Sequence, residues 1–126
     1  MKNKSFISSF KYAIKGLVTI IREERNFRFD LFMTLLVVIC SFVFPLLKWE
    51  RVTVYILCAL CLSLEAVNSA IERIVDFISP DFHSVAGSIK DISAAAVTIS
   101  AVISAIIGLY IFVPYAIDLL MQFLSK

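Results

Sequence analysis

Glycine, proline, cysteine and charge are all scarce in this sequence of 126 residues. It contains three glycines and three prolines, and 17% of its residues are charged. Gly16, Gly87 and Gly108 are isolated from one another, which excludes a glycine-rich phosphate-binding loop. No tract rich in Gly, Ser or Pro marks a linker, so residues 1–126 are expected to form a single domain. The net charge of only +2 gives no basic surface, and nucleic acid is not an expected partner.

Cysteine is present only three times, and each copy lies in an apolar stretch. Cys58 and Cys61 have the C-x-x-C spacing, but no second pair or flanking histidine completes a metal site. We therefore expect these two residues and Cys40 to be small apolar side chains inside membrane helices, without a disulfide framework.

Hydrophobic residues dominate what remains: they make up 60% of the chain, whereas an ordinary soluble domain contains about 45–50%. The runs 31–47, 52–64 and 92–117 contain no charged residue. The second run is too short to cross a bilayer, which takes about 20 residues, so its helix must continue through Glu65 and Glu72. The sequence predicts an all-α membrane protein with three spans, at about 29–47, 52–78 and 91–117.

Residues 4–25 are expected to form an amphipathic helix before the first span. At about 100° per residue its polar and apolar side chains separate onto two faces. The polar face holds Lys4, Ser8, Lys11, Lys15 and Arg22, and the apolar face holds Phe6, Phe10, Ala13, Leu17, Ile20 and Ile21. Such a helix suits an anionic membrane surface. Packing against its own bundle is an equally good alternative, and both can hold at once.

Lysine and arginine indicate the orientation of the spans. Seven of them precede the first span, at positions 2, 4, 11, 15, 22, 25 and 28. Arg73 and Lys90 flank the second connection, whereas Lys48 and Arg51 are the only basic residues in the first. The positive-inside rule then predicts that the amino terminus and the 73–90 connection are cytoplasmic.

Four polar residues form a stripe along the second span: Glu65, Asn68, Glu72 and Asp76. On a helix they fall within an arc of about 80°, with Glu65 about 10 Å deeper in the membrane than Glu72. A carboxylate at that depth is costly, by at least ~2.5 kcal/mol, and must face a cavity, a partner or a metal ion. A helix–helix hydrogen bond that holds an oligomer together is the structural alternative. Several acids in register instead favour a cation between them, because like charges repel.

Two further groups are expected at the same membrane face. Glu23 and Glu24 precede the first span and, with Glu72 and phosphate oxygens, could hold Mg²⁺, which takes one or two carboxylates plus substrate phosphates. For the Glu23–Glu24 pair alone, a solvated interfacial charge is the other interpretation. Lys90, followed by Asp91, could hold a phosphate as a point charge, or could be an anchor that extends to the interface.

The run from Glu65 to Asp76 resembles the signature E-x-x-N-[ST]-A-I-E-x-x-V-D of the prokaryotic diacylglycerol kinase and undecaprenol kinase family. Further matches are Gly16-Leu17, Glu24-x-Asn26-Phe27-Arg28, His83, and Lys90-Asp91 followed by Ala94-Ala95-Ala96-Val97. The resemblance covers about residues 5–115. It implies a homotrimer in the bacterial plasma membrane, with three spans per subunit, a surface helix, and active sites shared between subunits at the cytoplasmic face.

The resemblance also implies an activity and roles for individual residues. The reaction is the transfer of phosphate from MgATP to a membrane lipid alcohol, with Glu65 as catalytic base and with Asn68, Lys90 and Asp91 in the catalytic site. Glu24 and Glu72 match the metal ligands. The residues matched to ATP contacts are Tyr12, Glu24, Glu72, Asp81, Phe82, His83, Lys90 and Asp91. Ala94 accompanies Glu65 at the lipid substrate.

The resemblance favours undecaprenol as the lipid, because Glu24-x-Asn26-Phe27-Arg28 and Ile111-Phe112-x-Pro114 resemble the Gram-positive branch. Ser69, Gly87 and the absence of glycine from residues 93–96 lean instead toward diacylglycerol. A small ion-coupled transporter is a more remote alternative, and a purely structural membrane subunit is another. The transporter is disfavoured because the third span has no ionisable group between Asp91 and Asp118, whereas a relay needs such groups along the full depth.

Overall fold

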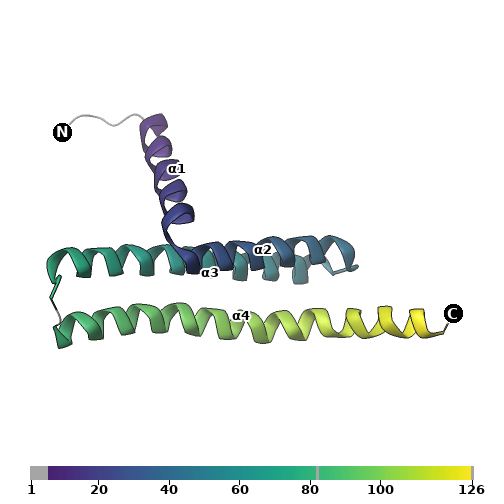
Figure 1. Cartoon of the computed structure of the whole chain (residues 1–126). Helices are drawn as coiled ribbons and strands as arrows, with labels where there is room; N and C mark the ends of the chain where they lie inside the picture. The colour runs from purple at the N-terminus through teal and green to yellow at the C-terminus, as the bar shows by residue number, and fades with distance from the viewer. Residues whose placement is uncertain (1–5, 82, 126) are drawn as a thin grey trace.

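The computed structural model describes residues 6–81 and 83–125, and this part of the chain is built from four α-helices without a strand (Figure 1). The helices are α1 (Phe6–Glu23), α2 (Arg25–Val43), α3 (Lys48–Ile78) and α4 (Ser84–Leu124). By length and composition α2, α3 and α4 are each able to cross a membrane. The predicted all-α class with three candidate spans is therefore confirmed. Residues 4 and 5 of the expected first helix lie outside the described residues.

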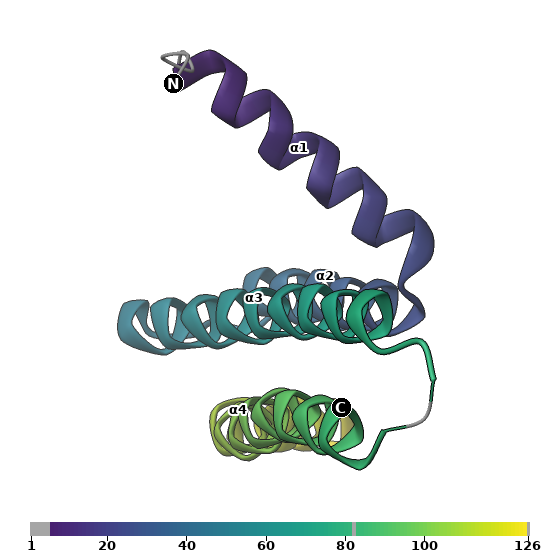
Figure 2. The same cartoon turned by 90° about the vertical axis from the view of Figure 1, so that its left-hand side faces the viewer.

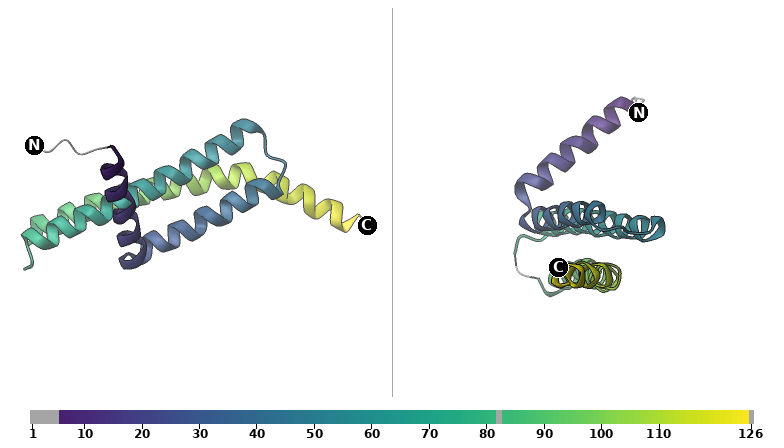
Figure 3. Two further views of the ribbon diagram at one scale, coloured as in Figure 1. Left: turned by 90° about the horizontal axis from the view of Figure 1, so that it is seen from above. Right: turned by 90° about the vertical axis from the view of Figure 1, so that its right-hand side faces the viewer.

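The three long helices run alongside one another, and α3 packs against both α2 and α4. Seen along the bundle, α2 and α3 form one layer and α4 forms a second (Figure 2). α1 leaves this bundle crosswise and projects from the side of α2 and α3 (Figures 1 and 3). The helices of the bundle thus run in the direction expected for spans, and α1 runs across that direction.

The chain turns sharply at Glu24, where α1 ends and α2 begins. The backbone of Glu24 is extended, with φ −100° and ψ 116°, so the helix is interrupted for one residue. Arg28 stabilises the turn, because its Nη1 donates to the carbonyls of Ile21 at 3.2 Å and Arg22 at 2.9 Å. These carbonyls lie in the last turn of α1 and have no partner within that helix. The helix expected over 4–25 consequently ends at Glu23, and the first spanning helix begins at Arg25 instead of near 29.

Pro45 determines where α2 ends. A proline disfavours helical conformation in the preceding residue, and Phe44 is extended, with φ −88° and ψ 143°. The helix therefore stops at Val43, before the expected boundary at 47.

α3 begins at Lys48, four positions before the expected boundary at 52, and ends at Ile78 as predicted. Its early start is stabilised by Glu50, whose Oε2 accepts a hydrogen bond from the backbone nitrogen of Leu47 at 2.8 Å. At the other end, Ser79 is the C-cap residue and precedes Pro80, which prevents the helix from continuing.

α4 extends beyond the expected span 91–117 at both ends. His83 caps its first turn, since Nδ1 accepts a hydrogen bond from the backbone nitrogen of Val85 at 3.3 Å. At the other end the helix continues through Pro114 to Leu124. The expected span 91–117 is thus part of a longer helix, because the residues on either side of the apolar run also adopt helical backbone.

The α3–α4 interface uses small residues. The less exposed positions of α4 recur at alternating steps of three and four, namely Ser93, Val97, Ser100, Ser104, Ile107 and Ile111. Ser104 Oγ lies 3.2 Å from Cys61 Sγ. Ser100 and Ser104 therefore belong to a packing seam, which small side chains make possible in lipid. All three cysteines are free, as expected.

A small apolar core closes the end of the bundle remote from α1. Leu46, Val54 and Ile111 are buried together there. Beside them the Tyr115 hydroxyl donates to Glu50 Oε2 at 2.7 Å, which joins α4 to the start of α3. Glu50 thus accepts from both the Leu47 backbone and the Tyr115 side chain.

We expect Tyr115→Phe to lower the thermal unfolding midpoint of the detergent-solubilised protein by a few degrees. The change removes the hydroxyl that donates to a carboxylate while keeping the ring, and hydrogen bonds to charged groups are the stronger ones. Tyr110→Phe is the matched control, because Tyr110 is 80% exposed on the same helix. Equal midpoints for the two variants would contradict the proposed link between α3 and α4.

Candidate active site

Glu65 is the most deeply buried ionisable side chain of the site, with 4% of its surface exposed. Three further carboxylates lie close enough to interact with it electrostatically: Asp30 of α2, Glu72 of α3 and Glu24 at the turn between α1 and α2. We call Glu24, Asp30, Glu65 and Glu72 the acidic cluster. The fold thus brings carboxylates from separate segments together, as the sequence predicted for Glu24, Glu65 and Glu72.

Asn68 lies within the polar stripe, between Glu65 and Glu72. Its Nδ2 donates to Glu72 Oε1 at 3.0 Å, one helical turn away. Its Oδ1 is buried and has no hydrogen-bond partner among the described residues. A buried acceptor without a partner is unfavourable, so this oxygen is suited to a bound donor or cation.

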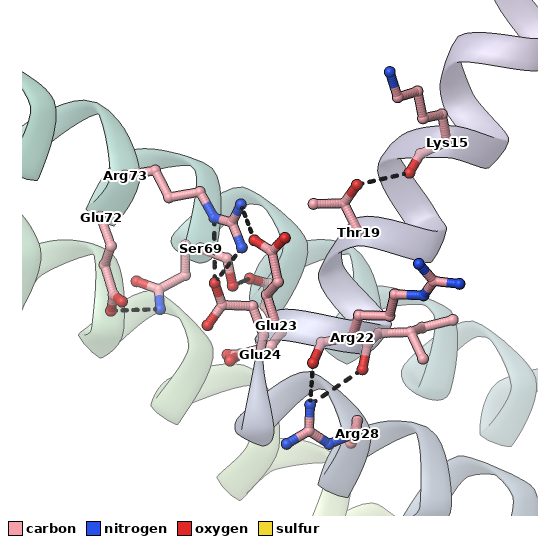
Figure 4. Close-up of polar contacts among 12 residues, drawn as sticks. Lys15, Thr19, Arg22, Glu23, Glu24, Arg28, Ser69, Glu72 and Arg73 are labelled. Carbon is pink, nitrogen blue, oxygen red and sulfur yellow. Dashed lines mark hydrogen bonds and ion pairs between the residues drawn. The ribbon is translucent and has the colours of Figure 1, made fainter.

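Glu24 and Glu23 are both paired with Arg73, which lies one residue after Glu72 (Figure 4). Arg73 Nη2 and Nε donate to Oε1 of Glu24 at 2.6 and 3.2 Å. Arg73 Nη1 lies 2.9 Å from Oε2 of Glu23. The guanidinium therefore joins the turn between α1 and α2 to α3. Sequence reasoning used Arg73 only to orient the spans and gave it no role in the site, because nothing in the sequence shows which carboxylates it meets.

Lys90 and Asp76 form a third ion pair, with Nζ 2.9 Å from Oδ1, between the start of α4 and the end of the polar stripe. Glu72 also acts on Lys90 electrostatically. The ammonium group thus lies beside the polar stripe. Asp91, the next residue, is exposed.

A pocket of about 380 Å³ opens beside Glu65. Its lining combines polar groups with apolar side chains and comes from the start of α2, from α3 and from α4: Arg25, Asn26, Phe29, Asp30, Glu65 and Val97. A mixed lining of this kind fits a hydroxyl group attached to an apolar chain.

Asp30 is the member of the acidic cluster that sequence reasoning missed. It lies immediately before the uncharged run that begins at residue 31. A carboxylate at the edge of a predicted span was therefore the sequence feature that could have identified Asp30 as a site residue. In the structure it lines the same pocket as Glu65.

The other predicted site residues are spread over the chain. Tyr12 of α1 lines a second pocket, of about 600 Å³, between α1 and α3. Ala94 is exposed on α4, and Asp81 and His83 lie in the α3–α4 connection. That connection lies at the end of the bundle, away from the point where α1 joins it (Figure 1). Phe82 lies outside the described residues.

Glu24 and Glu72 both carry carboxylate oxygens, which are the ligands that a hard divalent cation takes. Over residues 6–81 and 83–125, no group of three His, Cys, Asp or Glu side chains is able to hold a metal ion. Mg²⁺ does not need one, because it takes one or two carboxylates together with substrate phosphates. Both bonds from Arg73 to Glu24 end on Oε1, so Oε2 is outside this interaction.

Three helices able to cross a membrane, with a carboxylate-lined pocket among them, are the features of an integral membrane protein with a candidate active site. Comparison with known proteins identifies its family. Residues 11–112 match the family described as prokaryotic diacylglycerol kinase. Because this match covers most of the chain, the protein belongs to that family. It is a lipid kinase, and its reaction is a phosphoryl transfer from a nucleotide to a lipid.

Individual relatives agree with this assignment. The chain is 42% identical over 109 residues to an undecaprenol kinase from Bacillus subtilis, covering 86% of this chain and 89% of the relative. It is 32% identical over 101 residues to a diacylglycerol kinase from Haemophilus influenzae, covering 80% and 86%. A diacylglycerol kinase from Escherichia coli K12 is 32% identical over 100 residues, covering 79% and 82%.

Proposed function

We propose that this enzyme phosphorylates undecaprenol with MgATP and produces undecaprenyl phosphate, a lipid carrier recycled for cell-wall synthesis. The observation that carries the phosphoryl-transfer site is the acidic cluster, in which Glu24 and Glu72 act electrostatically on the buried carboxyl group of Glu65. The choice of undecaprenol is supported by the 42% identity to an undecaprenol kinase, against 32% to a diacylglycerol kinase.

Glu65 is the proposed base. In the pocket beside Val97 and Phe29, its carboxylate accepts a hydrogen bond from the lipid hydroxyl. The hydroxyl oxygen attacks the γ-phosphorus, the bond from that phosphorus to the β–γ bridging oxygen breaks, and ADP leaves. Glu65 takes the hydroxyl proton as the new P–O bond forms. Ala94, further along α4, is the proposed second contact for the lipid.

Glu24 and Glu72 are the proposed ligands of Mg²⁺, which neutralises charge on the phosphate groups when bound. Asn68 holds the Glu72 carboxylate through Nδ2, and its buried, unpaired Oδ1 is available to a bound donor or cation. Lys90 supplies a positive charge to the phosphates, and Asp91 is a further nucleotide contact. Catalysis then consists of positioning and charge neutralisation, as phosphoryl transfer generally requires.

The same proposal includes a homotrimer in the bacterial plasma membrane, with α1 and the active site on the cytoplasmic side. α1 lies across the bundle direction, and Phe6, Ile7 and Phe10 are exposed, as a helix in the membrane interface requires (Figure 1). Tyr12 lies on α1, whereas Asp81 and His83 belong to the α3–α4 connection. A site shared between neighbouring subunits is the arrangement in which these three residues contribute to one nucleotide.

Diacylglycerol is the second candidate substrate, with phosphatidic acid as its product. It is favoured by the diacylglycerol kinases among the relatives and by Ser69 and Gly87.

The purified protein, given radiolabelled ATP, Mg²⁺ and both lipids in equal amounts, is expected to label undecaprenol at least tenfold faster than diacylglycerol. The expected preference follows from the higher identity to an undecaprenol kinase, 42%, than to a diacylglycerol kinase, 32%. Thin-layer chromatography of the extracted lipids measures both products in one reaction. Faster labelling of diacylglycerol would assign the enzyme to the alternative, and labelling of neither lipid would contradict the proposed function.

A further inference from the structure

We propose that Arg73 is a positioning residue of this kinase: it fixes the Glu24 carboxylate for metal binding by clamping the turn between α1 and α2 onto α3. The proposal rests on the proposed function, since it concerns the metal site of that reaction. Arg73 occupies an unspecified position of the E-x-x-N-[ST]-A-I-E-x-x-V-D signature, so the family resemblance implies no role for it.

The geometry of the clamp is directional. Two guanidinium nitrogens of Arg73 converge on a single oxygen of Glu24, Oε1, at 2.6 and 3.2 Å. This arrangement anchors Oε1 and leaves Oε2 outside the contact with the guanidinium. The third nitrogen, Nη1, is occupied by Glu23 at 2.9 Å, which holds the guanidinium itself in place. Arg73 therefore positions one carboxylate oxygen and leaves the other for a cation.

The position of Glu24 in the backbone makes this clamp necessary. Glu24 is the extended residue between α1 and α2, so its side chain is not carried by a continuous helix. Glu72 is in the middle of a helix and its side chain is held by Asn68. Of the two proposed metal ligands, Glu24 is thus the one whose place depends on a contact from another element, and Arg73 supplies that contact from the residue next to Glu72 (Figure 4).

Charge repulsion acts in the opposite direction. The positive guanidinium repels a nearby divalent cation and so lowers its affinity. Removing the guanidinium, however, would let the Glu24 side chain sample several rotamers, which also lowers the affinity. The positioning effect is usually the larger of the two, because removal of a side chain that holds a metal-ligating carboxylate lowers metal affinity or activity about 10–100-fold. All three side chains of the clamp are partly exposed, with 43% for Arg73, 58% for Glu23 and 28% for Glu24, so solvent weakens the repulsion.

The test is a titration of Mn²⁺ into the detergent-solubilised protein with the β,γ-imido analogue of ATP, followed by electron paramagnetic resonance. We expect Arg73→Ala to weaken Mn²⁺ binding about tenfold. Arg73→Lys keeps the charge but cannot place two nitrogens on one oxygen, and should fall between wild type and Arg73→Ala. Glu23→Gln, which removes only the outer anchor, should weaken binding about twofold or less, by analogy with an exposed ion pair.

A double-mutant cycle with Glu24→Gln identifies the route. If Arg73 acts through Glu24, adding Arg73→Ala to Glu24→Gln produces no further loss of Mn²⁺ affinity. Unchanged or tighter Mn²⁺ binding in Arg73→Ala would overturn the proposal. The effect of Arg73 on the metal would then be limited to charge repulsion between its guanidinium and the cation. Circular dichroism checks folding, and if Arg73→Ala is unfolded, a wild-type affinity in Arg73→Lys overturns the proposal instead.

Lipid phosphorylation by the same samples separates this inference from the proposed function. Wild-type protein that labels no lipid, but shows the expected Mn²⁺ cycle, would remove the proposed function and leave the clamp. Wild-type protein that labels lipid, with Arg73→Ala equal to it in both Mn²⁺ affinity and the Mg²⁺ dependence of turnover, would remove the clamp alone.

Discussion

Glu65→Gln is expected to lower the turnover number of lipid phosphorylation by about 10²–10⁴-fold, the usual contribution of a positioned general base. Glutamine keeps the size and hydrogen-bonding capacity of the side chain but cannot take a proton from the lipid hydroxyl. Initial rates with radiolabelled ATP, at saturating ATP, Mg²⁺ and lipid, measure the effect. Because Glu65 has only 4% of its surface exposed and its charge is surrounded by acids, the neutral variant should fold at least as well as wild type.

Asp118→Asn is the matched control for this experiment. It makes the same carboxylate-to-amide change near the end of α4, more than a full span in sequence from the start of that helix. The Asp118→Asn variant should therefore retain wild-type turnover. Nucleotide binding by Glu65→Gln should also be retained, because the base contacts the lipid hydroxyl. A folded Glu65→Gln enzyme with full turnover would remove Glu65 from the role of base.

Glu72→Gln is expected to reduce turnover by about 10³-fold at moderate Mg²⁺, since metal ions contribute several kcal/mol to such transition states. An amide oxygen is still a weak ligand for a hard cation. Raising the Mg²⁺ concentration should therefore restore part of the activity of Glu72→Gln and none of that of Glu65→Gln. Mg²⁺ titrations of initial rate, run in parallel on both variants, make this comparison.

Glu72→Asp completes the second experiment. It keeps the negative charge but shortens the side chain, which breaks the 3.0 Å bond from Asn68 in its present geometry. An activity between those of wild type and Glu72→Gln would separate the contribution of charge from that of position. If Glu72→Gln had the wild-type Mg²⁺ dependence, Glu72 would not be a metal ligand.

Several features of the fold followed from local rules. Ser79-Pro80 ends α3 at Ile78 as predicted, because proline excludes helical backbone before it. Where the predicted helix boundaries were wrong, a local contact had been underestimated. The first spanning helix starts at Arg25 because the extended Glu24 and the Arg28 cap create a turn there, and α2 ends at Val43 because Pro45 acts on Phe44.

The polar stripe shows the same division within the site. Glu65, Asn68 and Glu72 share one helix, so their spacing alone predicted a common face and the Asn68–Glu72 bond is a contact of one helical turn. Asp30 lies at the boundary of a span and Arg73 lies within a helix, and charged residues are common at both kinds of position. Their roles arise only when α2 and the turn at Glu24 pack beside α3.

The sequence by itself determined that the chain is all-helical, that three segments are long and apolar enough to cross a membrane, and that one of them carries carboxylates into it. Hydropathy and helical periodicity are local properties, and they do not depend on which helices meet. Only the tertiary structure decided that Asp30 joins Glu65 at one pocket and that Arg73 holds Glu23 and Glu24. Such pairings depend on how distant segments pack, and the order of residues along the chain does not encode them in any short pattern.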